Sequence, residues 1–312
     1  MTDRQITITI LAYPGSIKSA QYGLQEMFEL ANQACSEQHI NVQFDTKIMQ
    51  VSDISNINNV TFDIVILPPA NSNHFYLKPD NAVLIWLSRQ HKQGAVLTSA
   101  CAGAFILAET GLIQTQKMTT HWNLEPDFKT MFPKVTLEIE KILINEGNII
   151  TAGGMMSWLD LGLELIAQFS HPSVMRQIGK MLVVDTGQRE QRYYQQFNPP
   201  FNHGDIVILK LQQHLQQTFM INTTITDLAL QCNLTSRTFL RRFYKVTCYK
   251  PTEYIQRLRI QKACELLETS RYSFEYIANK VGYEDTGACR KIFFRIIGLT
   301  PKNFRQRFMK NS

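Results

Sequence analysis

A cysteine lies in a run of small residues at positions 99–103 (SACAG), between a strand-like stretch and an apolar helix-like stretch. A sharp strand-to-helix turn requires small residues on both sides of its central residue. Such a turn would hold Cys101 over the carboxyl ends of a parallel sheet, at the N-terminus of the next helix. Backbone amides there favour an anion, which predicts either a lowered pKa of the thiol or a bound ligand carboxylate.

A histidine follows twenty residues later, in the run 119–122 (TTHW). Cys101 and His121 could form a nucleophile–base dyad, which would make the protein a cysteine-dependent hydrolase or amidase. Oxidation of Cys101 in a redox sensor is a second use of the same thiol. Both residues could instead be structural. We favour a further interpretation, in which the turn and the histidine line a pocket for a small molecule.

Basic residues recur on two short helix-like segments in the last third of the chain. These segments begin at Ser236 and Thr286, 50 residues apart, and each follows a shorter helix and a turn. Two helices joined by a short turn form a helix-turn-helix unit, whose second helix reads the major groove of DNA. The residues expected at the caps and turns of the two units are Thr226, Asn233, Gly282 and Asp285.

The charge is distributed unevenly between the two parts of the chain. Residues 205–312 hold 18 Lys and Arg against 8 Asp and Glu, a balance of +10, whereas residues 1–204 have a balance of −4. A basic segment attached to a mildly acidic one indicates that the second part contacts a polyanion. A solvated basic surface would show the same balance, so the interpretation depends on the two helix-turn-helix patterns.

The first part alternates strand-like and helix-like segments. Short β-branched or apolar runs occur at 6–11, 64–67, 95–98 and 148–151, and helical periodicity lies between them. We expect an α/β domain of flavodoxin-like type with a mainly parallel sheet over residues 1–186. The next segment, 187–204, is rich in glutamine and ends in a proline pair, which predicts an inter-domain connection. Residues 205–312 are expected to form an all-α domain with tandem helix-turn-helix units.

Several classes of protein are disfavoured by the composition. No apolar run approaches the roughly 20 residues of a membrane span, and the N-terminus lacks a signal-peptide layout, so we expect a cytoplasmic protein. The six cysteines form no CxxC pair and no metal-type spacing with the seven histidines. We therefore expect neither disulfides nor a metal, and no cofactor.

The basic region resembles the AraC family of bacterial regulators. The resemblance rests on residues 234–243 (LTSRTFLRRF), 251–259 (PTEYIQRLR), 277–285 (IANKVGYED) and 298–305 (GLTPKNFR), and spans about 205–308. The sequence departs from the family pattern at Cys248, Cys289 and Lys291. A helix between the two units, from Glu253 to about Thr269, would hold them at the spacing of successive major grooves, about 34–36 Å.

The AraC resemblance implies which side chains face DNA. Arginine there pairs bidentately with guanine, while lysine and threonine contact phosphate; an intradomain salt bridge is the alternative for Arg241 and Lys291. Arg242 is expected to point away and to be structural. The implied DNA-binding residues are Ser236, Arg237, Leu240, Arg241, Lys245, Thr286, Gly287, Arg290 and Lys291.

The first part resembles the ThiJ/PfpI superfamily, which is similar to class I glutamine amidotransferases. The matching stretches are 101–112 (CAGAFILAETGL), 119–122 (TTHW), 151–154 (TAGG) and Asp160-Leu161. Enzymes of that superfamily place a glutamate beside the cysteine, at a position near Ala20, where residues 16–20 (SIKSA) contain no carboxylate. Glu26 is further along and is expected to point elsewhere, so the resemblance implies a sensor and no working enzyme.

The combination of both parts resembles the GlxA group of transcription regulators. It implies sequence-specific binding to double-stranded DNA, control by an amino-acid-like or quaternary-ammonium effector, contact with RNA polymerase and a homodimer. Two aromatic residues near the pocket, Tyr13 and Trp122, could face a cationic effector or could equally belong to the core. The expected ligand-binding residues are Tyr13, Gly15, Cys101, Ala102, Gly103, His121, Trp122, Gly153 and Gly154.

Overall fold

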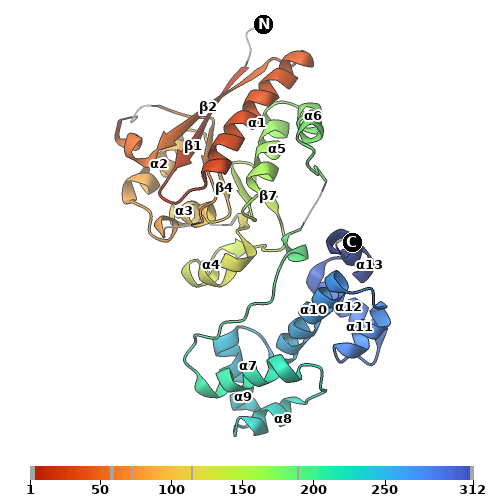
Figure 1. Cartoon of the computed structure of the whole chain (residues 1–312). Helices are drawn as coiled ribbons and strands as arrows, with labels where there is room; N and C mark the ends of the chain where they lie inside the picture. Colours follow the sequence, from red (N-terminus) through yellow and green to blue (C-terminus); the bar gives the residue numbers. More distant parts are fainter. Residues whose placement is uncertain (1–3, 57–59, 72–73, 114, 188–189, 310–312) are drawn as a thin grey trace. The chain divides into compact units, whose positions relative to one another are not determined.

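The protein is described by a computed structural model of residues 4–56, 60–71, 74–113, 115–187 and 190–309 (Figure 1). The chain forms two compact units, Met1–Gln191 and Arg192–Ser312. The boundary falls inside the predicted connection 187–204, of which residues 188 and 189 lie outside the described residues.

The first unit is built on a six-stranded sheet in the order β2-β1-β3-β4-β8-β7. All neighbouring strands are parallel except β7, which runs antiparallel to β8 at one edge. A separate parallel pair joins β5 to β6. The strands are β1 (Arg4–Ala12), β2 (Val42–Gln50), β3 (Ile64–Leu67), β4 (Val96–Ala100), β5 (Lys117–Met118), β6 (Thr136–Leu137), β7 (Leu143–Asn145) and β8 (Ile149–Ala152).

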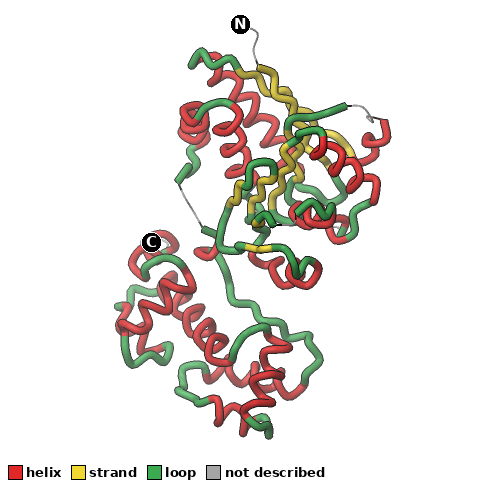
Figure 2. Tube along the Cα trace, turned by 180° about the vertical axis from the view of Figure 1, so that it is seen from behind, coloured by secondary structure: helices red, strands yellow, loops and turns green. Residues whose placement is uncertain are grey.

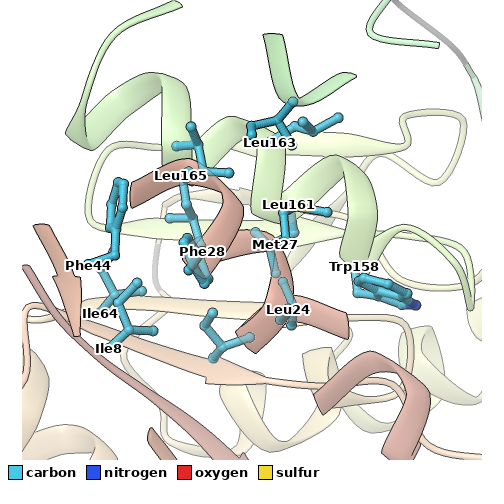
Figure 3. Packing of buried hydrophobic residues seen from close by; sticks show 14 of the residues in the cluster. Ile8, Leu24, Met27, Phe28, Phe44, Ile64, Trp158, Leu161, Leu163 and Leu165 are labelled. Atoms are coloured by element: carbon cyan, nitrogen blue, oxygen red, sulfur yellow. The ribbon is translucent and has the colours of Figure 1, made fainter. Parts of the chain in front are cut away.

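Helices cover both faces of this sheet because its central strands are apolar on both sides. In β3, Ile64 and Ile66 pack toward α1, α5 and α6, while Val65 and Leu67 pack toward α2 and α3. Figure 3 shows the first of these clusters, with Phe28 against Phe44 and Trp158 at its border. The helices are α1 (Lys18–Glu37), α2 (Asn81–Lys92), α3 (Gly103–Glu109), α4 (Glu125–Met131), α5 (Trp158–Phe169) and α6 (Pro172–Leu182). The α/β fold predicted from the sequence is confirmed.

The second unit is helical, and every described strand lies in the first unit (Figure 2). Two clusters of buried side chains form its core, one under α7 to α9 and one under α11 to α13. The long helix α10 contributes Tyr254 and Leu258 to the first cluster and Ile260, Ala263 and Leu267 to the second. The helices are α7 (Ile206–Thr218), α8 (Ile225–Gln231), α9 (Ser236–Thr247), α10 (Pro251–Thr269), α11 (Phe274–Lys280), α12 (Thr286–Ile297) and α13 (Pro301–Phe308).

The described part of the chain contains neither a membrane-spanning helix nor a cluster of metal-type side chains. None of its helices combines the length and apolarity needed to cross a bilayer. None of its His, Cys, Asp and Glu side chains gather in a group of three or more that could hold a metal ion.

Candidate functional site

The turn after β4 has the geometry expected of an elbow. Cys101 adopts φ 53°, in the left-handed region that few residues other than glycine occupy. Its N–H donates to Ala152 O on β8 at 2.8 Å, which ties the turn to the next strand. Gly103 lies against β3, where an added Cβ would come within 2.6 Å of Leu67 O. The predicted sharp turn at residues 99–103 is therefore confirmed.

The expected lowering of the thiol pKa is wrong. Cys101 is only 2% exposed, and burial raises its pKa to about 12, although the Ala102 N–H counteracts this in part. Removal from water penalises the thiolate more than one short helix stabilises it, because α3 has only seven residues. Ala20 is fully buried and Glu26 is exposed, so neither supplies a partner to the thiol.

One ring nitrogen of His121 is engaged by the backbone two residues later. Its Nδ1 accepts the N–H of Asn123 at 3.1 Å, which caps the short 3-10 helix Trp122–Leu124. Burial lowers the pKa of this histidine. Among the described residues no hydrogen bond joins its ring to the Cys101 thiol; the two segments meet instead where the Thr120 hydroxyl donates to Cys101 O at 2.8 Å.

Two other predicted pocket residues, Tyr13 and Gly15, have structural roles. Tyr13 is 3% exposed, its hydroxyl donates to Pro68 O, and its ring stacks on Phe75 with centroids 5.8 Å apart. Of the two possibilities for Tyr13, a cationic effector or the core, the structure supports the core, because the ring belongs to the cluster under α2 and α3. Gly15 supports the adjoining turn with φ 83°.

Sequence reasoning missed one residue of this region, Gln191. Only 3% of this residue is exposed. Its side chain lies against Thr119, Thr120, Trp122 and Gly153. The residues it contacts are 38 to 72 positions away in the chain, so no local pattern could reveal it. After Gly153-Gly154, Met155 and Met156 precede α5, which begins at Trp158.

Alkylation should distinguish the buried thiol from an exposed one. At pH 7.5 iodoacetamide should modify Cys101 at least about a thousandfold more slowly than Cys248, since a pKa of about 12 leaves little thiolate. Because the raised pKa lies above neutrality, the Cys101 rate should keep rising as pH increases toward 12. Peptide mapping by mass spectrometry gives both rates in one sample. Equal labelling of the two cysteines at pH 7.5 would contradict this assignment.

The first candidate reading helix, α9, presents one exposed stripe. Arg237, Leu240, Arg241 and Lys245 are exposed at spacings of three and four residues, with Ser236 half-buried at the start. The opposite face carries the buried Phe239 and Phe243. Among the described residues neither Arg241 nor Lys291 takes part in an ion pair. The alternative of an intradomain salt bridge is thus without support, and Arg242 instead pairs with Asp205, donating from Nη2 to Oδ1 at 2.9 Å.

The second candidate reading helix, α12, repeats this stripe at an offset of 50 residues. Arg290 and Lys291 are exposed, and Thr286 and Gly287 are half-buried at the helix start. The Arg290 guanidinium lies 5.7 Å from the Phe274 ring centroid. Two aromatic residues that sequence reasoning missed extend the stripes by one turn: Tyr244, 56% exposed, and Phe294, 52% exposed. Each lies four residues after a predicted DNA-facing residue, Leu240 or Arg290, and this spacing could have identified it.

The two helix-turn-helix units begin and end their reading helices in similar ways. Thr235 and Asp285 cap α9 and α12, and Cys248 and Gly298 end them in the left-handed conformation, at φ 62° and φ 82°. Cys248 therefore occupies a glycine-type position with a side chain. The cap of α8 is Thr224, not Thr226 as predicted: Thr224 Oγ1 accepts the N–H of Asp227, while the Asp227 carboxylate accepts the N–H of Thr224.

A buried junction joins the two helix-turn-helix units. Arg259 of α10 donates from Nε to Phe219 O at 2.7 Å and from Nη2 to Ile221 O at 3.3 Å and Asn222 Oδ1 at 3.1 Å. Gly282, in the turn of the second unit, lies so close to the same loop that a Cβ would come within 2.3 Å of Met220 O. The separation of α9 and α12 is therefore set by this junction as well as by α10.

The comparisons with known proteins fall on these same two units. Residues 25–168 match the DJ-1/PfpI family, and residues 228–307 match a helix-turn-helix domain family. The HTH-type transcriptional regulator GbdR of Pseudomonas aeruginosa is 24% identical over 230 residues, 71% of this chain and 60% of GbdR. The isonitrile hydratase of Pseudomonas putida is 25% identical over 172 residues, 53% of this chain and 69% of the enzyme.

A solved structure shares the fold. A Vibrio parahaemolyticus protein described as a transcriptional regulator superposes with a TM-score of 0.51 at 19% identity, covering 58% of this chain and 100% of that one. At this identity the likeness concerns the fold alone. The chain spans 60% of the length of GbdR, so similarity covers only part of that regulator.

Proposed function

We propose that this chain, which combines a DJ-1/PfpI domain with an AraC-type helix-turn-helix domain, is a sequence-specific DNA-binding transcription regulator. The observation that carries the proposal is the repetition of an exposed stripe with basic side chains on α9 and α12. The fixed junction around Arg259 supports it, because two reading helices can enter successive major grooves only at one separation. The similarity to GbdR points the same way.

For the individual contacts, we propose that arginines read bases and that the other polar residues contact phosphate. Arg237, Arg241 and Arg290 have the length and the fork geometry for guanine. Ser236, Lys245, Thr286 and Lys291 are placed for the backbone, and Leu240 for a thymine methyl group. Gly287 lets α12 approach the groove closely.

For the DJ-1/PfpI domain, we propose a sensor of a small metabolite and no enzyme. A raised thiol pKa, an engaged His121 and the lack of a carboxylate near Ala20 all disfavour nucleophilic catalysis. The similarity to isonitrile hydratase is compatible with this proposal, because one fold can carry catalysis in one protein and ligand binding in another. The proposed pocket keeps Cys101, Ala102, Gly103, His121, Trp122, Gly153 and Gly154. A cytoplasmic homodimer that contacts RNA polymerase completes the proposal.

Binding of the full chain to duplex DNA tests this function. Affinity should fall steeply with added salt, because each phosphate contact releases counterions. Arg237→Ala and Arg290→Ala should each cost about 1–3 kcal/mol of discrimination, or roughly 5- to 150-fold, at base pairs about one helical turn apart. Sites selected from a random duplex library, followed by footprinting at two salt concentrations, measure both effects.

Lys210→Ala provides the control, since it removes one exposed positive charge from α7 and leaves both reading helices intact. It should change affinity slightly and specificity not at all. Binding without sequence preference or salt dependence would refute the proposed function. Loss of discrimination at the same base pairs in both arginine variants would refute the tandem arrangement.

A further inference from the structure

The side chain of Gln191 fills a polar subsite inside the first unit. Its Nε2 donates toward four oxygen atoms: Thr120 O at 2.8 Å, Lys141 O at 2.9 Å, Thr119 Oγ1 at 3.1 Å and Ile139 O at 3.2 Å. Its Oε1 accepts the N–H of Trp122 at 3.2 Å. The amide therefore lies beside His121 and Trp122, within the proposed effector pocket.

The subsite is shaped around a nitrogen atom. A Cβ added to Gly153 would stand 1.8 Å from Gln191 Nε2, so only glycine leaves room for the amide. An amide nitrogen carries two protons, whereas four oxygens surround it here. A primary ammonium group carries three protons and a positive charge, which carbonyl and hydroxyl oxygens stabilise. The subsite thus suits a primary ammonium better than the amide it holds.

The chain at Glu190 and Gln191 is also held to the same unit outside the Gln191 side chain. The backbone N–H of Gln191 donates to Glu140 O at 2.8 Å, and Glu190 forms an isolated bridge and a 3.8 Å ion pair with Lys141. The Lys141 side chain of that pair is 52% exposed and the Glu190 side chain 21%, so solvent screens the pair in part. The buried amide adds several hydrogen bonds to this attachment.

The chain that follows Gln191 is fastened to the DNA-binding unit. Tyr194 accepts a hydrogen bond from Arg307 Nη2 at 3.0 Å and stacks edge-on against Phe308 of α13. Phe197 packs edge-on against Tyr254 of α10, with centroids 5.0 Å apart, and its N–H donates to Gln261 Oε1 at 2.6 Å. Residues 192–204 therefore belong to the helical unit as a strap across its two cores.

We propose that Gln191 is an internal ligand of the effector pocket, and that a primary ammonium group of the effector displaces its amide and frees the chain at residues 190–191. The proposal rests on the proposed function, because the freed chain leads directly into the DNA-binding unit. Displacement occurs only if the effector binds the open state more tightly than the closed state. A quaternary ammonium has no N–H to offer and should not displace the amide.

Hydrogen exchange measured on the full chain tests the internal ligand. Gln191→Ala should speed exchange of the amides in peptides covering 119–124 and 190–194 by about tenfold, because one buried multi-bond anchor is lost. Gly153→Ala should do the same, since its methyl group occupies the place of the amide. Gln196→Ala is the matched control: Gln196 is an exposed glutamine of the strap 192–204, and its removal should leave exchange unchanged.

Calorimetric titration with ethylammonium chloride tests the ligand class, with tetramethylammonium chloride as the probe that lacks N–H groups. Gln191→Ala should bind ethylammonium about tenfold more tightly than the unaltered chain, because the competing amide is gone. Gly153→Ala, whose subsite is filled, should bind it no better. Ethylammonium should also speed exchange at 190–194 in the unaltered chain, a readout that needs no variant.

Each outcome has a separate meaning. Exchange at wild-type rates in both Gln191→Ala and Gly153→Ala would overturn the anchor. Equal binding of ethylammonium by Gln191→Ala and the unaltered chain, or binding of tetramethylammonium instead, would overturn the subsite. Absence of sequence-specific DNA binding would refute the proposed function while leaving the Gln191 measurements valid.

Discussion

Gly282→Ala should lower the free energy of opening of the second helix-turn-helix unit by about 2–5 kcal/mol. Gly282 adopts φ 89°, where an L-residue costs about 1–2 kcal/mol. The added Cβ would also meet Met220 O at 2.3 Å, and that contact involves backbone that has no rotamer to change. Native-state hydrogen exchange of the α11 and α12 amides measures the loss.

Gly204→Ala separates the two contributions to this effect. Gly204 has φ 74° but no atom within 4 Å of its added Cβ, so this variant carries only the conformational cost. It should cost about 1–2 kcal/mol. Equal effects of the two variants would show that the close approach to Met220 has no energetic weight.

Arg259→Ala should cost about 3 kcal/mol and loosen the spacing of the two reading helices. The change leaves Phe219 O, Ile221 O and Asn222 Oδ1 without their donor, in a place where Arg259 is 9% exposed. A buried acceptor without a partner costs about 1–3 kcal/mol, and water can satisfy part of the loss. Hydrogen exchange at 219–224 and affinity for a two-groove site should both report the change.

Arg257→Ala is the matched control on the same helix. Arg257 pairs with Glu253 four residues earlier, with Nε 3.0 Å from Oε1, at a partly exposed position. Such helix-surface pairs contribute about 0.3–0.5 kcal/mol, so stability should change little. If DNA affinity falls equally in both variants while exchange at 219–224 stays unchanged, Arg259 does not hold the junction.

Local patterns predicted much of the fold because they depend on near neighbours. The β-branched runs formed β1, β3, β4 and β8, and the small residues around Cys101 formed the elbow. Stripes at three- and four-residue spacing marked the exposed faces of α9 and α12. The predicted cap at Thr226 was wrong by two residues. Thr224 and Asp227 form a reciprocal capping pair, which starts the helix at Ile225.

The candidate pocket was predicted less well than the DNA-facing surface. A reading helix needs only a periodic stripe and a cap, both of which are visible within twelve residues. A pocket depends on which distant segments meet, and the thiol pKa depends on how completely they exclude water. Burial therefore reversed the expected direction of the Cys101 shift.

By itself the sequence determined the two-part organisation, the elbow and the pair of reading helices, because periodicity, capping and residue size act locally. Only the tertiary structure decided that Tyr13 is core, that Arg259 joins the helix-turn-helix units and that Gln191 fills the polar subsite. These contacts link residues 37 to 72 positions apart or lie within a packed core. Their partners are selected by packing and by the need to pair buried polar groups, which no short segment encodes.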